Sequence, residues 1–174
     1  METHAFLKKF RHVPICSIEQ MPYRVAYGVD DIKRVIPHRD PFLLIESIEG
    51  MNLEEQAMIG SRFIPASDPI FRGHFPDFPV YPGALLLEMM GQMAAALAFF
   101  LARGDHRIPA DAAPLQVRAT KVLGADFLEP VRPDSHVTMA GKRIYWDDFC
   151  ARFAGQAMVN GKVCCIGVAE LYVF

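Results

Sequence analysis

The chain of 174 residues has the length of one domain, and its formal net charge is −2, with a pI near 6.3. A hydrophobic content of 52% and a mean hydropathy of +0.16 exclude a disordered protein and indicate a large core or a core plus a buried subunit interface. The sequence has no long run of Lys and Arg, which argues against nucleic acid as a partner because phosphate binding needs clustered cations.

The first 30 residues predict an N-terminal extension, either partly ordered or an edge element, ahead of a single domain over residues 31–174. This segment has no sustained apolar stretch and no small-residue cleavage site, so we expect no signal peptide. The four cysteines include no CxxC pair and no Cys–His metal spacing. We therefore expect free thiols in a reducing cytoplasm and no metal site.

The segment before residue 80 predicts a short helix and a hairpin. A helix is expected over residues 29–36. Apolar residues predict strands over 42–48 and 56–64, with a break at Gly50-Met51-Asn52 between them. Residues 65–77 are expected to be irregular.

The longest apolar run of the chain, residues 84–102, predicts a helix with no polar face apart from Glu88 and Gln92. Pro82 suits the first helical position, and Gly104 offers a stop. A helix that is apolar all round lies in a core or in lipid. Because a charge inside a membrane span is costly, Glu88 favours a core helix and no membrane span.

Strands are expected after the helix over residues 115–122, 136–145, 149–159 and 162–173. Asn160-Gly161 between two apolar runs is a strong hairpin signal, since both turn residues need positive φ. The count is one buried helix and five or six antiparallel strands without βαβ alternation. The predicted fold is α+β, an antiparallel sheet wrapped around the long central helix.

Two residues of this central region have the chemistry of a general base and a general acid. The neutral imidazole of His74 is suited to accept a proton near neutral pH. Burial of Glu88 in an apolar helix raises its pKa and favours the protonated acid, unless a partner compensates. Together they could remove a proton from carbon and give a proton to a leaving hydroxyl.

The start of the same helix offers a site for a carbonyl oxygen. The N–H groups of Gly83 and Ala84 have no intrahelical acceptor and could stabilise an enolate-like transition state. Gln92 lies four residues after Glu88 on the same face and could orient its carboxyl group. The other histidines are interpreted as ordinary surface or loop residues: His4, His12, His38, His106 and His136.

These residues lie in motifs that resemble a known family, the bacterial (3R)-hydroxyacyl-[acyl carrier protein] dehydratases of the FabZ type. The resemblance covers about residues 30–170, and its central motif is the most specific part. Glu88 favours the FabZ-like branch, because related FabA-type dehydratase/isomerases have Asp at the acid position. The motif residues are Pro37-His38-Arg39, Pro41 to Leu44, Gly73 to Pro76, Pro79, Pro82-Gly83, Leu87-Glu88-Met89, Gln92, Phe127, Pro130-Val131, Pro133-Asp134 and Gly161-Lys162-Val163.

The resemblance implies a hotdog fold and a homodimer, in which each of two active sites takes the histidine from one subunit and the acid from the other. It implies reversible loss of water from a (3R)-3-hydroxyacyl thioester, giving the trans-2-enoyl thioester. The acyl group would arrive on the phosphopantetheine of an acyl carrier protein, with no metal or organic cofactor. His74 would take the α-proton and Glu88 would protonate the leaving hydroxyl. The expected substrate-binding residues are Gly83, Ala84, Gln92 and Phe75, with the Gly83 N–H polarising the carbonyl.

Two departures from the family pattern stand out: the segment before about residue 30 is long, and Gly91 replaces the usual alanine before Gln92. A hotdog thioesterase and a non-catalytic acyl-binding or carrier-binding protein are the alternative functions. Acyl chain length, the pathway served, and a dimer against a trimer of dimers stay open.

Overall fold

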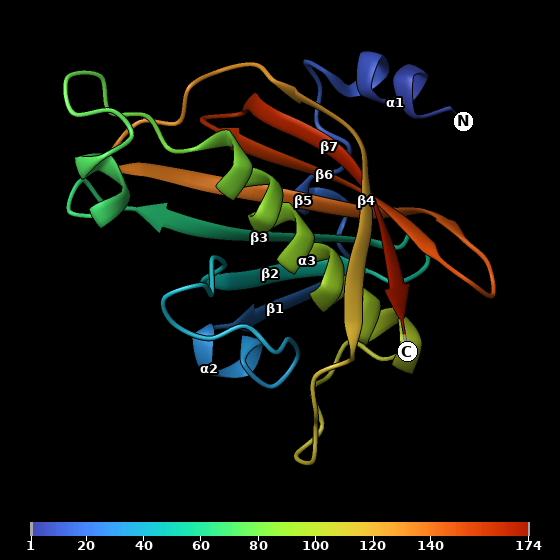
Figure 1. The fold of residues 1–174 in the computed structure, drawn as a ribbon. Helices are drawn as coiled ribbons and strands as arrows, with labels where there is room; N and C mark the ends of the chain where they lie inside the picture. The colour runs from blue at the N-terminus through green and yellow to red at the C-terminus, as the bar shows by residue number, and fades with distance from the viewer. Residues whose placement is uncertain (1, 174) are drawn as a thin grey trace.

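A computed structural model describes residues 2–173 of the chain. Seven antiparallel strands form one sheet in the order β1-β2-β3-β5-β6-β7-β4. Figure 1 shows the sheet curving around the long helix α3, which crosses its concave face, so the predicted α+β hotdog architecture is confirmed. The strands are β1 Tyr23–Tyr27, β2 Ser47–Asn52, β3 Ala57–Ile64, β4 Val117–Phe127, β5 Ser135–Trp146, β6 Ala151–Val159 and β7 Lys162–Val173.

The central helix α3, Gly83–Arg103, is confirmed as a buried core element. Its C-cap is Gly104, whose φ of 65° lies in the left-handed region that glycine adopts without a Cβ clash. Pro82 precedes the helix as its N-cap with a ψ of 128°, so the expectation that it is the first helical residue was wrong by one position. The shift leaves the backbone N–H of Gly83 at the first turn of the helix.

The strand expected over residues 42–48 was wrong, because β2 starts only at Ser47 and continues through Gly50 to Asn52. Gly50 is needed inside the strand: a Cβ there would lie 2.9 Å from both Ile18 Cδ1 and Met21 Cβ, where the N-terminal segment crosses. The backbones of Phe42 and Leu44 bond to the Gln92 side chain of α3, and only Glu46 donates its N–H to a β3 carbonyl, that of Ser61 (3.0 Å). The predicted β3 and the Asn160-Gly161 turn are confirmed, with φ of 50° and 75° at the two turn residues.

Apolar side chains cover both faces of the sheet. Met58, Met139 and Phe153 pack in the cluster around α3, whereas their sequence neighbours Ile59, Ala140 and Ala154 belong to a second cluster. Successive strand residues point to opposite faces, so the second cluster lies on the outer face. Helix α1, Thr3–Phe10, contributes Phe6 and Leu7 to this second cluster and packs against β4 and β7.

The first 30 residues supply α1, the short 3₁₀ helix Ile18–Gln20 and edge strand β1, which pairs with β2. Gln156 of β6 is fully buried and holds the connection after α1 by accepting from the Ile15 N–H (2.7 Å) and donating to the carbonyls of Phe10 (2.6 Å) and Val13 (2.9 Å). The division of the chain at residue 30 stays a proposal. The segment before residue 30, which it describes as an extension, contributes one strand to the sheet.

Two short helices precede the loops that carry the site residues. Helix α2, Val29–Ile32, is shorter than the expected span to residue 36, and hydrogen-bonded turns complete that span. The 3₁₀ helix Pro69–Arg72 has Asp68 as its N-cap, and the Asp68 side chain accepts from the Ile70 N–H. This 3₁₀ helix leads directly into the loop that holds His74. All four cysteines are free thiols, as expected.

Candidate active site

The imidazole of His74 is held by the loop that connects the 3₁₀ helix to α3. Its Nδ1 lies 2.9 Å from the carbonyl oxygen of Val80, and the Phe75 ring stacks on it with centroids 4.1 Å apart. A carbonyl oxygen only accepts, so Nδ1 carries the hydrogen of this bond. In the neutral imidazole, Nε2 is then the nitrogen with a free lone pair, and it can accept a proton.

A cavity of about 480 Å³ lies between this histidine and the start of α3. Gly83 and Phe127 are in close contact there: a Cβ on Gly83 would lie 2.5 Å from two carbons of the Phe127 ring. Glycine therefore lets an aromatic side chain pack over the helix start, beside N–H groups that have no intrahelical acceptor. The lining residues are His74, Val80, Tyr81, Gly83, Ala84, Leu86, Phe127, Leu128, Glu129, Pro130, Val131 and Cys164.

The carboxyl group of Glu88 lies in the second turn of α3 and is one-third exposed, at 33% for its side chain. Gln92 Nε2 donates to its Oε1 at 2.9 Å, and His38 Nε2 lies 3.4 Å from the same oxygen. Burial raises the pKa of Glu88, but the hydrogen bonds from His38 and Gln92 outweigh burial and leave the pKa lowered. The compensating partners that a buried acid requires are thus both present.

Gln92 is completely buried and joins α3 to the loop before β2. Its Oε1 accepts from the Leu44 N–H at 2.7 Å, and its Nε2 donates to the Phe42 carbonyl at 2.8 Å as well as to Glu88. These bonds explain why the apolar segment after Pro41 forms no strand: its backbone groups bond to a helix side chain. The predicted contact between Gln92 and Glu88 on one helix face is confirmed.

His38 was interpreted as an ordinary loop residue, and the structure places it against Glu88. Its Nδ1 is shut off from solvent and has no hydrogen-bond partner among residues 2–173. No local periodicity connects a loop between two prolines to a helix 50 residues later. The one available signal was that an isolated acid in an apolar helix needs a partner from elsewhere in the chain.

The candidate residues form two groups. His74 shares its cavity with Gly83 and Ala84, whereas Glu88 lies with Gln92 and His38 and is not part of the lining of that cavity. Within the described chain no hydrogen bond or ion pair joins the two groups.

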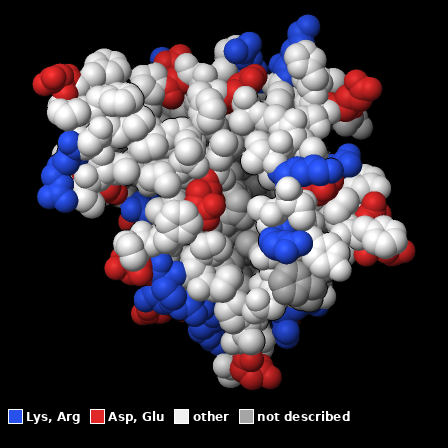
Figure 2. All heavy atoms as spheres, viewed as in Figure 1, with Lys and Arg blue, Asp and Glu red and all other residues white. Residues whose placement is uncertain are grey.

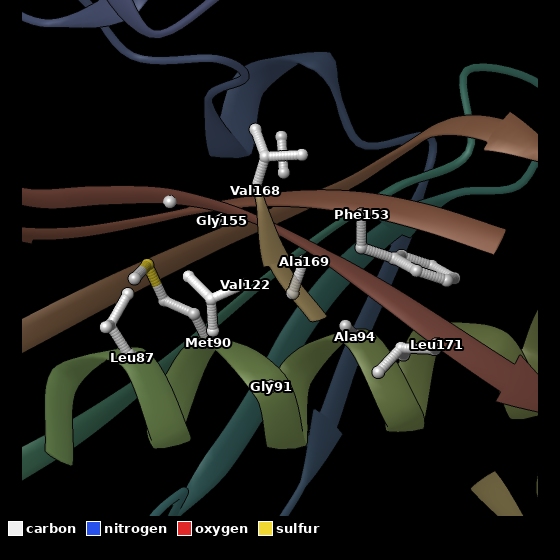
Figure 3. Close-up of a pocket in the computed structure, with 12 residues that line it drawn as sticks. Leu87, Met90, Gly91, Ala94, Val122, Phe153, Gly155, Val168, Ala169 and Leu171 are labelled. Atoms are coloured by element: carbon white, nitrogen blue, oxygen red, sulfur yellow. The ribbon is translucent and has the colours of Figure 1, made fainter. Parts of the chain in front are cut away.

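A second, apolar cavity lies between α3 and strands β4, β6 and β7. Figure 3 shows Leu87, Met90, Gly91 and Ala94 of α3 below the strand residues that close it. Its volume of about 40 Å³ suffices for roughly one water-sized molecule and not for an acyl chain. A Cβ on Gly91 would meet no atom within 4 Å, so this position is open.

Charged side chains of both signs are scattered over the face that carries α3, as Figure 2 shows, and neither sign forms a continuous patch there. In residues 2–173 no group of three or more His, Cys, Asp or Glu side chains could hold a metal ion. Helix α3 has the length and hydropathy of a membrane span, but 67% of its most apolar window is buried inside the fold, which is the arrangement of a core helix.

Comparisons with known proteins agree on one family. A family model described as a FabA-like domain matches residues 36–167. The 3-hydroxyacyl-[acyl-carrier-protein] dehydratase FabZ of Solibacter usitatus is 36% identical, with 78% of each chain covered. The protein of the same name from Campylobacter jejuni is 36% identical, with 82% of this chain and 93% of that protein covered.

Solved structures support the fold. The dehydratase heterocomplex ApeI:P from Xenorhabdus doucetiae matches with a TM-score of 0.59 and 17% identity, covering 82% of this chain and 90% of that chain. A hypothetical thioesterase with coenzyme A from Streptococcus pneumoniae matches with a TM-score of 0.55 and 13% identity, covering 73% and 84%. At these identities the structures indicate the hotdog architecture alone. By the family model and the sequence relatives, the chain belongs to the FabA-like family and, within it, to the FabZ-type dehydratases.

Proposed function

We propose that this protein is a 3-hydroxyacyl-[acyl carrier protein] dehydratase, which removes water from the (3R)-3-hydroxyacyl thioester and yields the trans-2-enoyl thioester. The setting is fatty-acid or related lipid biosynthesis in the cytoplasm. The relatives named above support the reaction. The observation that carries the proposal is the His74 Nδ1 contact with the Val80 carbonyl, which leaves Nε2 as a free base beside an open helix start.

In the proposed mechanism, two groups of the protein move the two protons. Nε2 of His74 takes the proton from Cα, and the electrons of that C–H bond form the double bond between Cα and Cβ. The C–O bond at Cβ breaks, and the hydroxyl leaves as water with a proton from Glu88. Solvent then takes the proton from His74 and returns one to Glu88.

The thioester carbonyl binds at the start of α3 in this proposal. The negative charge that develops on its oxygen is stabilised by the N–H groups of Gly83 and Ala84, which are oriented before the reaction starts. Phe75 lies flat against the imidazole and forms one wall for the acyl chain. Gln92 orients the carboxyl group of Glu88.

A second copy of the chain completes each site. The separation of the His74 cavity from Glu88 supports this arrangement, because within one chain the acid does not line the cavity. Strand β4 also supports it: β4 is an edge strand with one neighbour, β7, and it exposes Val122 at 62% and Phe127 at 58%. An edge strand with exposed apolar side chains is a surface that another strand can join.

The acyl carrier protein brings the substrate on its phosphopantetheine, and it is the one macromolecular partner besides the second subunit; nucleic acid is not a partner. The two proton-transfer groups and the helix N–H groups suffice for the reaction, so we propose that the enzyme uses no metal or organic cofactor. The assembly is a homodimer, alone or within a trimer of dimers.

The test uses the full chain and an enoyl or 3-hydroxyacyl thioester on acyl carrier protein. The ultraviolet absorbance of the enoyl thioester follows dehydration, and a thiol reagent follows thioester hydrolysis in parallel. We expect an absorbance change without thiol release, with His74→Ala and Glu88→Gln both folded and inactive. Thiol release without an enoyl signal would assign a thioesterase instead. If no substrate of any chain length were converted, the non-catalytic alternative would replace the proposal.

A further inference from the structure

We propose that His38 is a positioning residue for this reaction: as a neutral imidazole with its hydrogen on Nε2, it holds one oxygen of Glu88 together with Gln92, so that the other oxygen exchanges the proton with substrate. The kinetic effect of His38 rests on the proposed dehydratase function. The tautomer of His38 and the orientation of the Glu88 carboxyl group follow from the geometry alone.

Both donors converge on the same carboxyl oxygen. Gln92 Nε2 lies 2.9 Å and His38 Nε2 lies 3.4 Å from Glu88 Oε1, while Oε2 has no hydrogen-bond partner in the described chain. A carboxyl group protonated on Oε2 still accepts hydrogen bonds at Oε1, and so does the carboxylate. The two donors therefore hold the group in one orientation in both states, and no rotation is needed between them.

The buried Nδ1 of His38 indicates which form of the imidazole is present. In the imidazolium, Nδ1 would be an N–H donor shut off from water with no acceptor among residues 2–173. In the neutral form with hydrogen on Nε2, Nδ1 is a bare acceptor, and unpaired buried acceptors are tolerated better than unpaired donors. The same form provides the Nε2–H that faces Glu88, so both observations select one tautomer.

The backbone around His38 is fixed from two sides. Arg39 donates through Nη1 to the carbonyls of Ile36 (2.9 Å) and His38 (2.6 Å). Gln92 holds the residues that follow through the backbone of Phe42 and Leu44. One buried glutamine thus orients both the loop that carries the imidazole and the carboxyl group that the imidazole contacts.

The charged groups around Glu88 are few. His38 is the one titratable side chain that contributes to the shift of its pKa, and the Arg39 guanidinium is engaged by carbonyls of its own loop. Loss of the His38 donor removes a hydrogen bond that stabilises the carboxylate, so the pKa of Glu88 rises. Dehydration needs protonated Glu88, and its rate falls as pH rises through that pKa. In His38 variants this fall is therefore expected at higher pH than in the wild type.

The kinetic test compares the wild-type chain with His38→Ala and His38→Gln, and the matched control is His136→Gln at an exposed histidine near the start of β5. We expect His38→Ala to lower kcat about tenfold or more with a small change in KM. The fall in rate through the pKa of Glu88 should move to higher pH. His38→Gln, which keeps a donor, should recover part of kcat, and the control should match the wild type. If the pH of this fall were unchanged in His38→Ala, whether or not kcat falls, the proposal would be overturned.

A second measurement does not depend on activity and separates this inference from the proposed function. The ¹⁵N spectrum of histidine-labelled protein at neutral pH reports each tautomer, and we expect the His38 signals of neutral imidazole with hydrogen on Nε2. An imidazolium, or hydrogen on Nδ1, would overturn the inference even in a fully active enzyme. A wild-type chain without dehydratase activity would instead refute the proposed function, while the spectrum still decides the tautomer of His38.

Discussion

Substitution of Gln156 tests most directly how the N-terminal segment is attached to the sheet. It is fully buried on β6 and makes three hydrogen bonds to the backbone between α1 and β1: from the Ile15 N–H and to the Phe10 and Val13 carbonyls. Gln156→Leu keeps the approximate size of the side chain and removes all three bonds. The change therefore isolates the polar attachment from the packing of the outer cluster.

The size of the effect follows from the environment of each partner. Three hydrogen bonds at about 1 kcal/mol each amount to about 3 kcal/mol. The Ile15 N–H bond is buried, and an unpaired buried donor adds up to about 2 kcal/mol. The bonds to Phe10 and Val13 are only partly buried, so water replaces part of their contribution. We expect a loss of about 2–4 kcal/mol in the free energy of unfolding, a large part of the roughly 5–15 kcal/mol of a typical domain.

Urea unfolding followed by circular dichroism measures this loss, and Gln116→Leu is the control because Gln116 is exposed. The control should change the free energy of unfolding by less than about 0.5 kcal/mol. Dehydratase kcat of folded Gln156→Leu should equal that of the wild type, since the residue faces away from α3. A loss below about 1 kcal/mol would show that packing alone attaches the segment, and the reasoning would fail.

Of two further predictions, one concerns a glycine in the sheet and a glycine in α3, and the other concerns the hairpin between β5 and β6. Gly155→Ala places a Cβ 2.7 Å from Met90 Cβ and should lower the free energy of unfolding by about 1–3 kcal/mol, whereas Gly91→Ala meets no atom and should raise it by up to about 1 kcal/mol. Urea unfolding compares the pair, and equal effects would refute the packing described here. A hydrogen bond from Tyr145 and two from backbone amides lower the pKa of Asp147 from 3.8 to about 2. The stabilising effect of ionised Asp147 is present above pH 4 and lost as pH falls through 2. Amide exchange in the hairpin should therefore depend less on pH in this acid range in Asp147→Asn than in the wild type. An unchanged pH dependence would contradict this.

Elements with strong local signals were predictable from the sequence. The apolar run of α3 with Gly104 after it, and the Asn160-Gly161 turn between two apolar runs, contain in a few residues the physical reason for their structure. The pairing of Gln92 with Glu88 was also predictable, because four residues along a helix is one turn.

Contacts between distant segments were not predictable in this way. Gly50 resembles a strand break, but it is required inside β2 because Ile18 and Met21 cross it. The segment after Pro41 has the composition of a strand and is bonded to Gln92 instead. His38 acquires its place beside Glu88 through the same loop. In each case the deciding partner lies tens of residues away, and no periodicity reports it.

The central claim is that one chain provides the base and a second chain the acid of each site. It is tested by mixing His74→Ala and Glu88→Gln subunits after reversible dissociation and measuring dehydration. In a random mixture half of the dimers are mixed, and each mixed dimer has one intact site, so about a quarter of wild-type activity should return. Each variant alone should stay inactive. A mixture as inactive as its parents, with mixed dimers verified by mass spectrometry, would contradict the account.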